Sequence, residues 1–190
     1  MRKMVARIGM LLLLLTLAPA ADLQAYSWGE YTWYLNPANN HYYALTFLTG
    51  TWTGAEAEAL AMGGHLASIT SLAEETWIDN KFSTLTTYWI GGTDAALEGR
   101  WVWTTGELWS YANWAWGEPN NAFPEHYLVK NITWYGINTN QWNDEQDGGY
   151  TGPHQGIIEV GTVPLPPGAW LLGTGLLVLG LPSLRRGRKE

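Results

Sequence analysis

Most of the positive charge in this chain lies at its two ends. The residues between the ends are strongly acidic, and any folded domain that they form is acidic as well. Three of the ten Lys and Arg residues lie within positions 1–7, and four lie within 185–189. Residues 21–163 hold the other three together with 16 of the 17 acidic residues, a formal charge of −13. A domain this acidic either tolerates its self-repulsion or binds a cation that relieves it. We therefore expect a single acidic domain with a separate segment at each end.

The first 20 residues have the pattern of a secretory signal peptide. Three basic residues precede the apolar run 8–17, which leads into the small residues of 18–20. A basic start, a short apolar stretch and an A-x-A exit are typical of a cleaved export signal. The apolar run is short for a membrane anchor. We predict that residues 1–20 form a signal peptide and that the rest of the chain is exported.

The last 30 residues combine an uncharged stretch with a basic end. No charged residue occurs within 160–184, and four basic residues follow closely. An apolar helix over about 168–184 would be long enough to span a bilayer. The basic end would then stay on the cytoplasmic side of the membrane.

The same segment, 161–190, resembles a PEP-CTERM sorting signal of Gram-negative bacteria. The resemblance rests on the proline motif 163–167, the apolar run and the final arginines, although Leu165 stands where an acid is usual. It implies an exosortase-type sorting enzyme as a partner. The protein would be anchored in the inner membrane before sorting, and would then reach the cell surface or the extracellular matrix. An ordinary single-span anchor explains the hydropathy and the charge equally well.

Composition excludes several functional classes. The chain has no cysteine, which excludes disulfides, thiolate metal sites and a cysteine nucleophile. The acidic balance argues against a nucleic acid partner, because few basic side chains are available to neutralise phosphates. The four histidines are scattered, and no two have the spacing of a metal site.

Residues 21–160 have the pattern of an α+β domain. We predict helices over 51–62 and from Ser71 to Phe82, because apolar residues recur there at helical spacing. Gly63 is suited to end the first helix, and Ser71 with Glu74 forms a capping box for the second. Short segments that alternate or are rich in aromatic or branched residues predict strands: a hairpin at 28–47, and strands at 65–69, 88–91, 100–103, 127–129 and 156–160.

Two long polar stretches, 110–124 and 139–153, are expected to be functional loops. They and the residue that follows the first supply carboxylate and amide oxygens: Glu118, Asn120, Glu125, Asn143 and Asp144. Calcium is a hard cation that takes six to eight ligands of this kind. Any one of these residues alone is equally well explained as a solvated acid or a turn residue.

Taken in order, these segments resemble the C-type lectin domain. The matching pieces are Trp52-x-x-Ala55, Gly63-Gly-His-Leu-Ala67, Trp89-Ile-Gly-Gly92, Gly99-Arg-Trp-Val-Trp103, Tyr111-x-Asn-Trp114, Gly117-Glu-Pro-Asn-Asn121, Trp142-Asn-Asp144 and Ile157-Ile-Glu159. They cover roughly residues 30–160. The resemblance implies an α+β fold of two helices, small antiparallel sheets and a long calcium-binding loop region.

The resemblance also implies a ligand set. Calcium and two neighbouring hydroxyls of a glycan or exopolysaccharide would be bound by the same side chains: Glu118, Asn120, Glu125, Asn143 and Asp144. Pro119 would be cis, and in the family Glu-Pro-Asn accompanies a preference for mannose-type sugars over galactose. Trp116 lies beside this set, where its ring could stack on a sugar.

A second, weaker calcium site is implied as well, with Asp94, Glu98 and Asn121 as its ligands. Glu125 and His126 would contribute to it, but Asn121 and His126 replace acids of the family pattern. The disulfides of animal members are also missing, because Ala59, Tyr127 and Ile158 stand at cysteine positions. Abundant tryptophan is expected to offset that loss by burying large aromatic rings.

Three functions follow from these observations. The first is a secreted, calcium-dependent carbohydrate-binding protein. The second is a lectin-like domain that binds protein or forms part of an extracellular matrix, with calcium only bracing the loops. The third is a hydrolase using Glu118 and Asp144 as a carboxylate pair. Calcium would keep those acids ionised and leave no proton donor, so we expect the protein not to be an enzyme.

Overall fold

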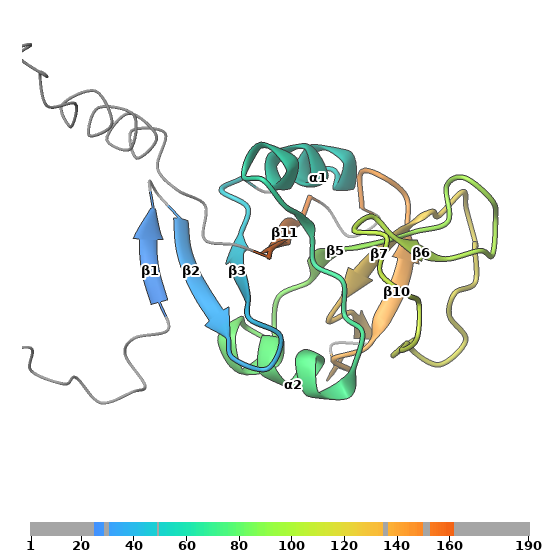
Figure 1. Cartoon of the computed structure of the whole chain (residues 1–190). Helices are drawn as coiled ribbons and strands as arrows, with labels where there is room; N and C mark the ends of the chain where they lie inside the picture. Colours follow the sequence, from blue (N-terminus) through green and yellow to red (C-terminus); the bar gives the residue numbers. More distant parts are fainter. Residues whose placement is uncertain (1–24, 29–30, 49, 135–136, 150–152, 162–190) are drawn as a thin grey trace, which may run out of the picture.

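The computed structural model describes residues 25–28, 31–48, 50–134, 137–149 and 153–161 (Figure 1). The predicted signal peptide, 1–20, lies outside these residues. So does the predicted sorting signal from residue 162 onward, with its apolar helix at 168–184. Neither helix in the described part of the chain has both the length and the apolar character needed to cross a bilayer.

The two predicted helices are present, and each begins at a polar cap. Helix α1 (Trp52–Ala61) is capped by Thr51, whose side chain accepts a hydrogen bond from the Gly54 N–H at 3.0 Å. It ends beside Gly63, which has a φ of 83° that favours glycine. Helix α2 (Leu72–Lys81) is capped by Ser71. Its buried residues include the predicted Ile78 and, just past its end, Phe82.

The strands form one mixed sheet and a separate hairpin. Their bounds are β1 (Ala25–Trp28), β2 (Tyr31–Asn36), β3 (His41–Leu45), β4 (His65–Leu66), β5 (Tyr88–Thr93), β6 (Val102–Trp103), β7 (Tyr127–Lys130), β8 (Thr133–Trp134), β9 (Ile137–Asn138), β10 (Trp142–Glu145) and β11 (Gln155–Val160). The order in the sheet is β1-β2-β3-β11-β5-β7-β10, with β4 on β11 and β6 on β5, while β8 and β9 pair separately. The α+β class with two helices is therefore confirmed.

Strand β11 joins the two halves of the sheet. It pairs antiparallel with β3 along one edge. Along the other edge it pairs antiparallel with β4 and parallel with β5, where Gln155 faces Tyr88. The sequence predicted antiparallel sheets, and the β11–β5 ladder is the exception among the ladders of the described strands. A parallel partner cannot be read from a local pattern, because it depends on a connection far along the chain.

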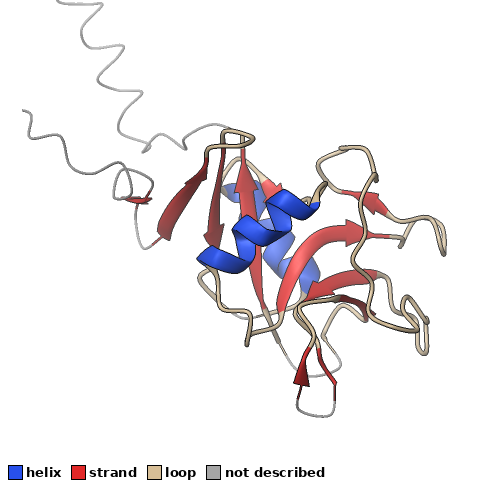
Figure 2. Ribbon diagram, turned by 90° about the horizontal axis from the view of Figure 1, so that it is seen from below, coloured by secondary structure: helices blue, strands red, loops and turns tan. Residues whose placement is uncertain are grey.

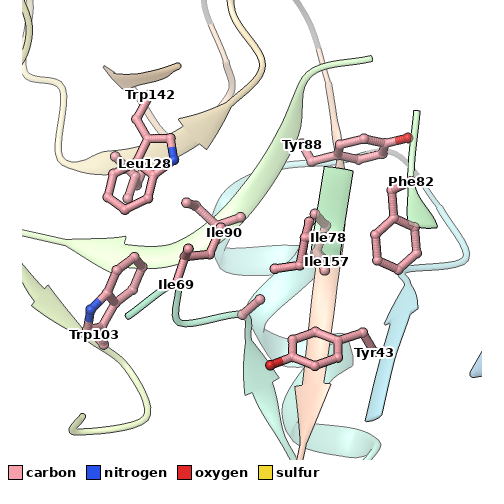
Figure 3. Close-up of a cluster of buried hydrophobic side chains, with 11 residues drawn as sticks. Tyr43, Ile69, Ile78, Phe82, Tyr88, Ile90, Trp103, Leu128, Trp142 and Ile157 are labelled. Atoms are coloured by element: carbon pink, nitrogen blue, oxygen red, sulfur yellow. The ribbon is translucent and has the colours of Figure 1, made fainter. Parts of the chain in front are cut away.

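The core lies between the sheet and both helices, and tryptophan fills much of it. Ile78, Ile90 and Ile157 are fully buried at its centre, and Trp103 and Trp142 lie toward one end (Figure 3). The Trp103 and Trp109 rings stack with centroids 4.4 Å apart. Burial of Trp52, Trp89, Trp103 and Trp142 agrees with the expectation that these rings pack the interior.

One segment predicted as loop contains a strand. Trp142–Glu145, within the predicted loop 139–153, forms β10 and pairs antiparallel with β7. The polar side chains of Asn143 and Asp144 hide the strand from a hydrophobicity pattern. The other long connection, 110–124, does lack helix and regular strand, and the long loops gather on the side of the molecule away from β1 (Figures 1 and 2).

Candidate functional site

The predicted ligand residues come together because loop 110–124 is bonded to the edge of β10. The backbone N–H of Trp142 donates to the Asn113 carbonyl at 2.8 Å, and the Ala115 N–H donates to the Trp142 carbonyl at 2.9 Å. These bonds form a parallel bridge between Trp114 and Trp142. The loop that carries Glu118 therefore runs beside the strand that carries Asp144.

Asp144 fixes the path of the loop through its side chain. The carboxylate is 1% exposed, and it accepts hydrogen bonds from the N–H groups of Asn120 at 3.2 Å and Asn121 at 2.8 Å. The preceding peptide bond, Glu118–Pro119, is cis, as the resemblance implied. Glu118 and Asn120 are thus held on either side of Pro119, next to a buried acid.

Glu125 closes the same loop from its other end. It is 6% exposed, and its Oε2 accepts from the Ala122 N–H at 3.0 Å. The Asn120 side-chain oxygen also accepts from that N–H, at 2.7 Å. Asn121 accepts from the Glu125 N–H at 3.0 Å. Backbone donors therefore hold the segment 120–125 as one compact turn with its oxygens close to Asp144.

The acids of this loop raise one another's affinity for protons. Burial, with the neighbouring Asp144 and Glu125 carboxylates, raises the pKa of Glu118 to about 7. Burial and Asp144 also raise the pKa of Glu125 above its ordinary value. No Lys, Arg or His side chain within the described residues forms an ion pair with any of the three. The loop therefore concentrates negative charge without a cation from the chain.

Two side-chain oxygens of the predicted ligand set have no hydrogen-bond partner among the described residues. They are Glu118 Oε2 and Asn143 Oδ1, and both are buried. A buried polar atom without a partner is costly, and native proteins rarely keep one without a reason. Three carboxylates, amide oxygens and these two buried atoms match the ligand chemistry of a hard cation. The predicted set, Glu118, Asn120, Glu125, Asn143 and Asp144, therefore fits calcium.

The second predicted calcium site contains a histidine side chain next to its two acids. Asp94 Oδ1 and Glu98 Oε2 lie 3.0 and 3.4 Å from the Nδ1 atom of His126. One ligand atom from each of these residues lies within 4.8 Å of the others. Asn121, predicted as the third ligand, accepts a hydrogen bond from the Glu125 N–H with its side-chain oxygen. His126 is therefore the residue that the structure brings to Asp94 and Glu98.

A family model described as the Lectin C-type domain matches residues 49–151, more than half of the chain. The chain belongs to the C-type lectin domain family. It is 36% identical over 91 residues to the galactose-specific lectin nattectin of Thalassophryne nattereri and 35% identical over 98 residues to ladderlectin of Oncorhynchus mykiss. These matches cover 45% and 50% of this chain and 57% and 50% of those proteins, so the chain spans about half of the length of these relatives.

Solved C-type lectin domains have the same fold. The herring type II antifreeze protein superposes with a TM-score of 0.59 at 29% identity, over 70% of this chain and 96% of that one. The carbohydrate-recognition domain of cow CD23, solved in the presence of a GlcNAc2Man3 oligosaccharide, gives a TM-score of 0.57 at 25% identity over 67% and 92%. The predicted C-type lectin-like fold is therefore confirmed.

This C-type lectin domain also exposes two aromatic rings near its loop site. Trp116, two residues before Glu118, is 89% exposed, and Phe123, two residues before Glu125, is 58% exposed. Neither ring belongs to a core cluster of the described residues. Trp116 was predicted to stand beside the ligands, whereas Phe123 was not, because a lone Phe in a polar loop gives no signal of its exposure.

Proposed function

We propose that this protein is an exported, calcium-dependent carbohydrate-binding protein. The observation that carries the proposal is the gathering of Glu118 and Glu125 at the buried Asp144, together with buried oxygens of Glu118 and Asn143 that have no partner among the described residues. Bound calcium would balance the acids and supply coordination positions for sugar hydroxyls. Family membership supports carbohydrate binding as the general function.

Side chains of the loop would form hydrogen bonds with the sugar hydroxyl groups. Carboxylates such as Glu118 and Asp144 accept hydrogen bonds, whereas the amides of Asn120 and Asn143 also donate them. A hydroxyl between an acid and an amide can therefore donate to one and accept from the other. Trp116, which is free of the core, could stack on the ring of the same or the next sugar.

The sugar preference that we propose is mannose-type, from the order Glu118-Pro119-Asn120. The cow CD23 domain with its mannose-containing oligosaccharide is compatible with this choice. The relative nattectin is described as galactose-specific, so family membership alone does not decide the sugar. Among the similar structures is also a calcium-independent antifreeze protein. The alternative is therefore a lectin-like domain that binds protein or builds a matrix, with calcium only bracing the loops.

Export and sorting remain part of the proposal. Residues 1–20 and 161–190 would direct the chain to the inner membrane of a Gram-negative bacterium, where an exosortase-type enzyme would process it. The lectin domain would then act at the cell surface or in the extracellular matrix. Cell fractionation, with and without residues 161–190, tests this localisation.

A glycan array tests the binding function. Residues 21–163 are applied with calcium and again with a chelator, and we expect mannose-type binding that the chelator removes. Glu118→Gln with Asn120→Asp should shift the preference toward galactose, because it exchanges the acid and the amide. Glu107→Gln, which changes an exposed acid outside the loop, is the matched control. Glycan binding that persists in chelator contradicts the proposal.

A further inference from the structure

A pocket of about 330 Å³ lies on the opposite end of the sheet from the calcium loops. It is lined by residues of β2, β3, β5 and β11 and by the end of α2, including Tyr34, Phe82 and Tyr88. Tyr88 begins β5, whereas Thr93 at the other end of that strand pairs with Tyr127, two residues after Glu125. Five steps along a strand span roughly 17 Å. The pocket is therefore separate from the loop site.

Aromatic rings form the floor and the rim of this pocket. Phe82 and Tyr88 lie next to each other at the end of the core away from Trp103 (Figure 3), and they are 8% and 3% exposed. Tyr34 meets the Phe82 ring edge-on, with centroids 5.7 Å apart. Phe47, at the rim, is 57% exposed. Such rings can pack against the apolar C–H faces of a sugar.

Polar groups accompany the rings. The phenolic oxygens of Tyr34 and Tyr88 form no hydrogen bond to another part of the described chain, so both hydroxyls can bond a ligand. Gln155 is held in place by its donation to the Thr46 carbonyl at 2.6 Å. Aromatic walls with a few fixed polar groups are typical of small-ligand sites, and a volume near the lower end of the usual range suits one sugar ring.

The pocket also carries one unpaired positive charge. Lys81 is its one charged residue, and its ammonium lies 5.9 Å from the Tyr34 ring centroid and 5.8 Å from that of Trp77. No carboxylate of the described chain forms an ion pair with Lys81, whereas Lys130 is paired with two. In a domain this acidic, an ammonium left without an anion is charge-complementary to a ligand carboxylate.

We propose that this pocket binds an acidic sugar, a pyranose ring bearing one carboxylate, without calcium. The carboxylate pairs with the Lys81 ammonium, the ring packs against Tyr34 and Phe47, and its hydroxyls bond the Tyr88 phenol. The protein then has two saccharide sites with different chemistry. One is a neutral-sugar site that depends on calcium, and the other is a uronate site that depends on lysine.

Calorimetric titration of the full chain in excess chelator tests the proposal. The probes are a galacturonic acid disaccharide and the neutral galactose disaccharide of the same linkage. We expect the uronate to bind about tenfold more tightly than the neutral sugar, because a charge-assisted hydrogen bond is lost with the carboxylate. High salt should weaken the uronate binding and leave the neutral sugar unchanged.

Three variants separate the pocket from the rest of the surface. Lys81→Met keeps the aliphatic stem and should bring uronate binding down to that of the neutral sugar. Tyr88→Phe removes only a hydroxyl and should weaken the binding of both sugars severalfold. Arg100→Met is the matched control, since it removes an exposed positive charge at the other end of β5 and should leave binding unchanged. Unchanged unfolding midpoints establish that the variants are folded.

Several outcomes overturn the proposal. Equal binding of the neutral and acidic disaccharides, or no binding of either, excludes a uronate site. Full binding by Lys81→Met excludes the role of the ammonium. Binding of benzoate as tight as that of the uronate disaccharide identifies a pocket for aromatic anions instead. Because the titration contains chelator, a failure here says nothing against the calcium site, and a calcium site that fails on the glycan array leaves this test intact.

Discussion

Two groups of acids lie toward opposite ends of the same β7–β10 ladder, and their negative charges are balanced in different ways. At one end, Lys130 lies opposite Trp142, and its fully buried ammonium pairs with Glu75 at 3.0 Å and Asp79 at 2.8 Å. At the other end, Asp144 lies opposite Leu128, and no basic side chain of the described residues pairs with it.

The difference shows how one small sheet can use buried carboxylates for structure and for binding. The Glu75 carboxylate is fully engaged, since it also accepts from the Trp142 indole at 2.7 Å and the Tyr111 hydroxyl at 2.6 Å. Glu118 keeps a buried oxygen without a partner. The acids that are paired with Lys130 help to hold the fold together. The acids around Asp144 have no such partner among the described residues, so they are suited to bind a cation from solution.

The largest effect is expected when the built-in cation is removed. Lys130→Met leaves Glu75 and Asp79 without their ammonium, and should lower the free energy of unfolding by about 3–5 kcal/mol. Chemical denaturation measures the loss. Arg100→Met, which removes an exposed charge, should change stability by less than about 0.5 kcal/mol. If both variants are equally stable, the ion pair does not hold this end of the ladder.

The next largest effect is expected when calcium binds at the other end of the ladder, beside Asp144, and stabilises the folded domain. A ligand at 100 times its Kd stabilises the folded state by about 2.7 kcal/mol, and thermal unfolding with calcium and with chelator measures this gain. Asp144→Asn should abolish the gain, because it removes a buried ligand charge. Glu107→Gln should retain it in full. A gain that survives in Asp144→Asn would place the calcium elsewhere.

A smaller effect is the pH dependence of the calcium-free domain. The pKa of Glu118 is about 7 in the folded state and near 4.5 in the unfolded chain. The folded state therefore binds the proton more tightly, and the free energy of unfolding falls as pH rises from about 5 to 8. The His41 pKa is raised by Glu159, and its contribution falls in the same direction. Glu118→Gln should remove the contribution of Glu118 to this pH dependence and leave that of His41. Denaturation in chelator at a series of pH values measures the free energy of unfolding of both proteins.

The smallest change in stability is expected for a substitution of His126. The same substitution should change the number of calcium ions bound per chain. Its imidazole already lies between Asp94 and Glu98, so we expect the wild-type protein to bind one calcium per chain. His126→Asp replaces that group by an acid and should add a second calcium in calorimetric titration. The loss of the contacts of this partly exposed imidazole should cost less than about 1 kcal/mol. Two calcium ions in the wild type would contradict the assignment.

Local patterns predicted the helices and most strands of this domain. The capping residue Ser71, and the aromatic segments that became β2, β5 and β7, act within a few neighbouring residues, so the sequence displays them directly. The cis bond before Pro119 and the gathering of the loop acids followed from the family resemblance.

Three of the features that were missed depend on distant contacts. Strand β10 has polar residues where alternation would need apolar ones, and only its pairing with β7 makes it a strand. The sequence did not predict the burial of Lys130, because a lysine at the end of a strand gives no sign of being buried. Its acidic partners lie on α2, about 50 residues earlier. His126 was seen as a lost acid, whereas its place between Asp94 and Glu98 required the folded loop.

The position of β11 has a consequence for the order in which the domain can fold. This strand follows all the others, yet it is the partner that β3, β4 and β5 share. Until residue 160 has been synthesised, the first hairpin and the strands of the loop half have no common neighbour. Such long-range pairing slows folding. The chain therefore completes its sheet only after synthesis of the domain ends, and a chain that stops before Gln155 would leave two unjoined halves.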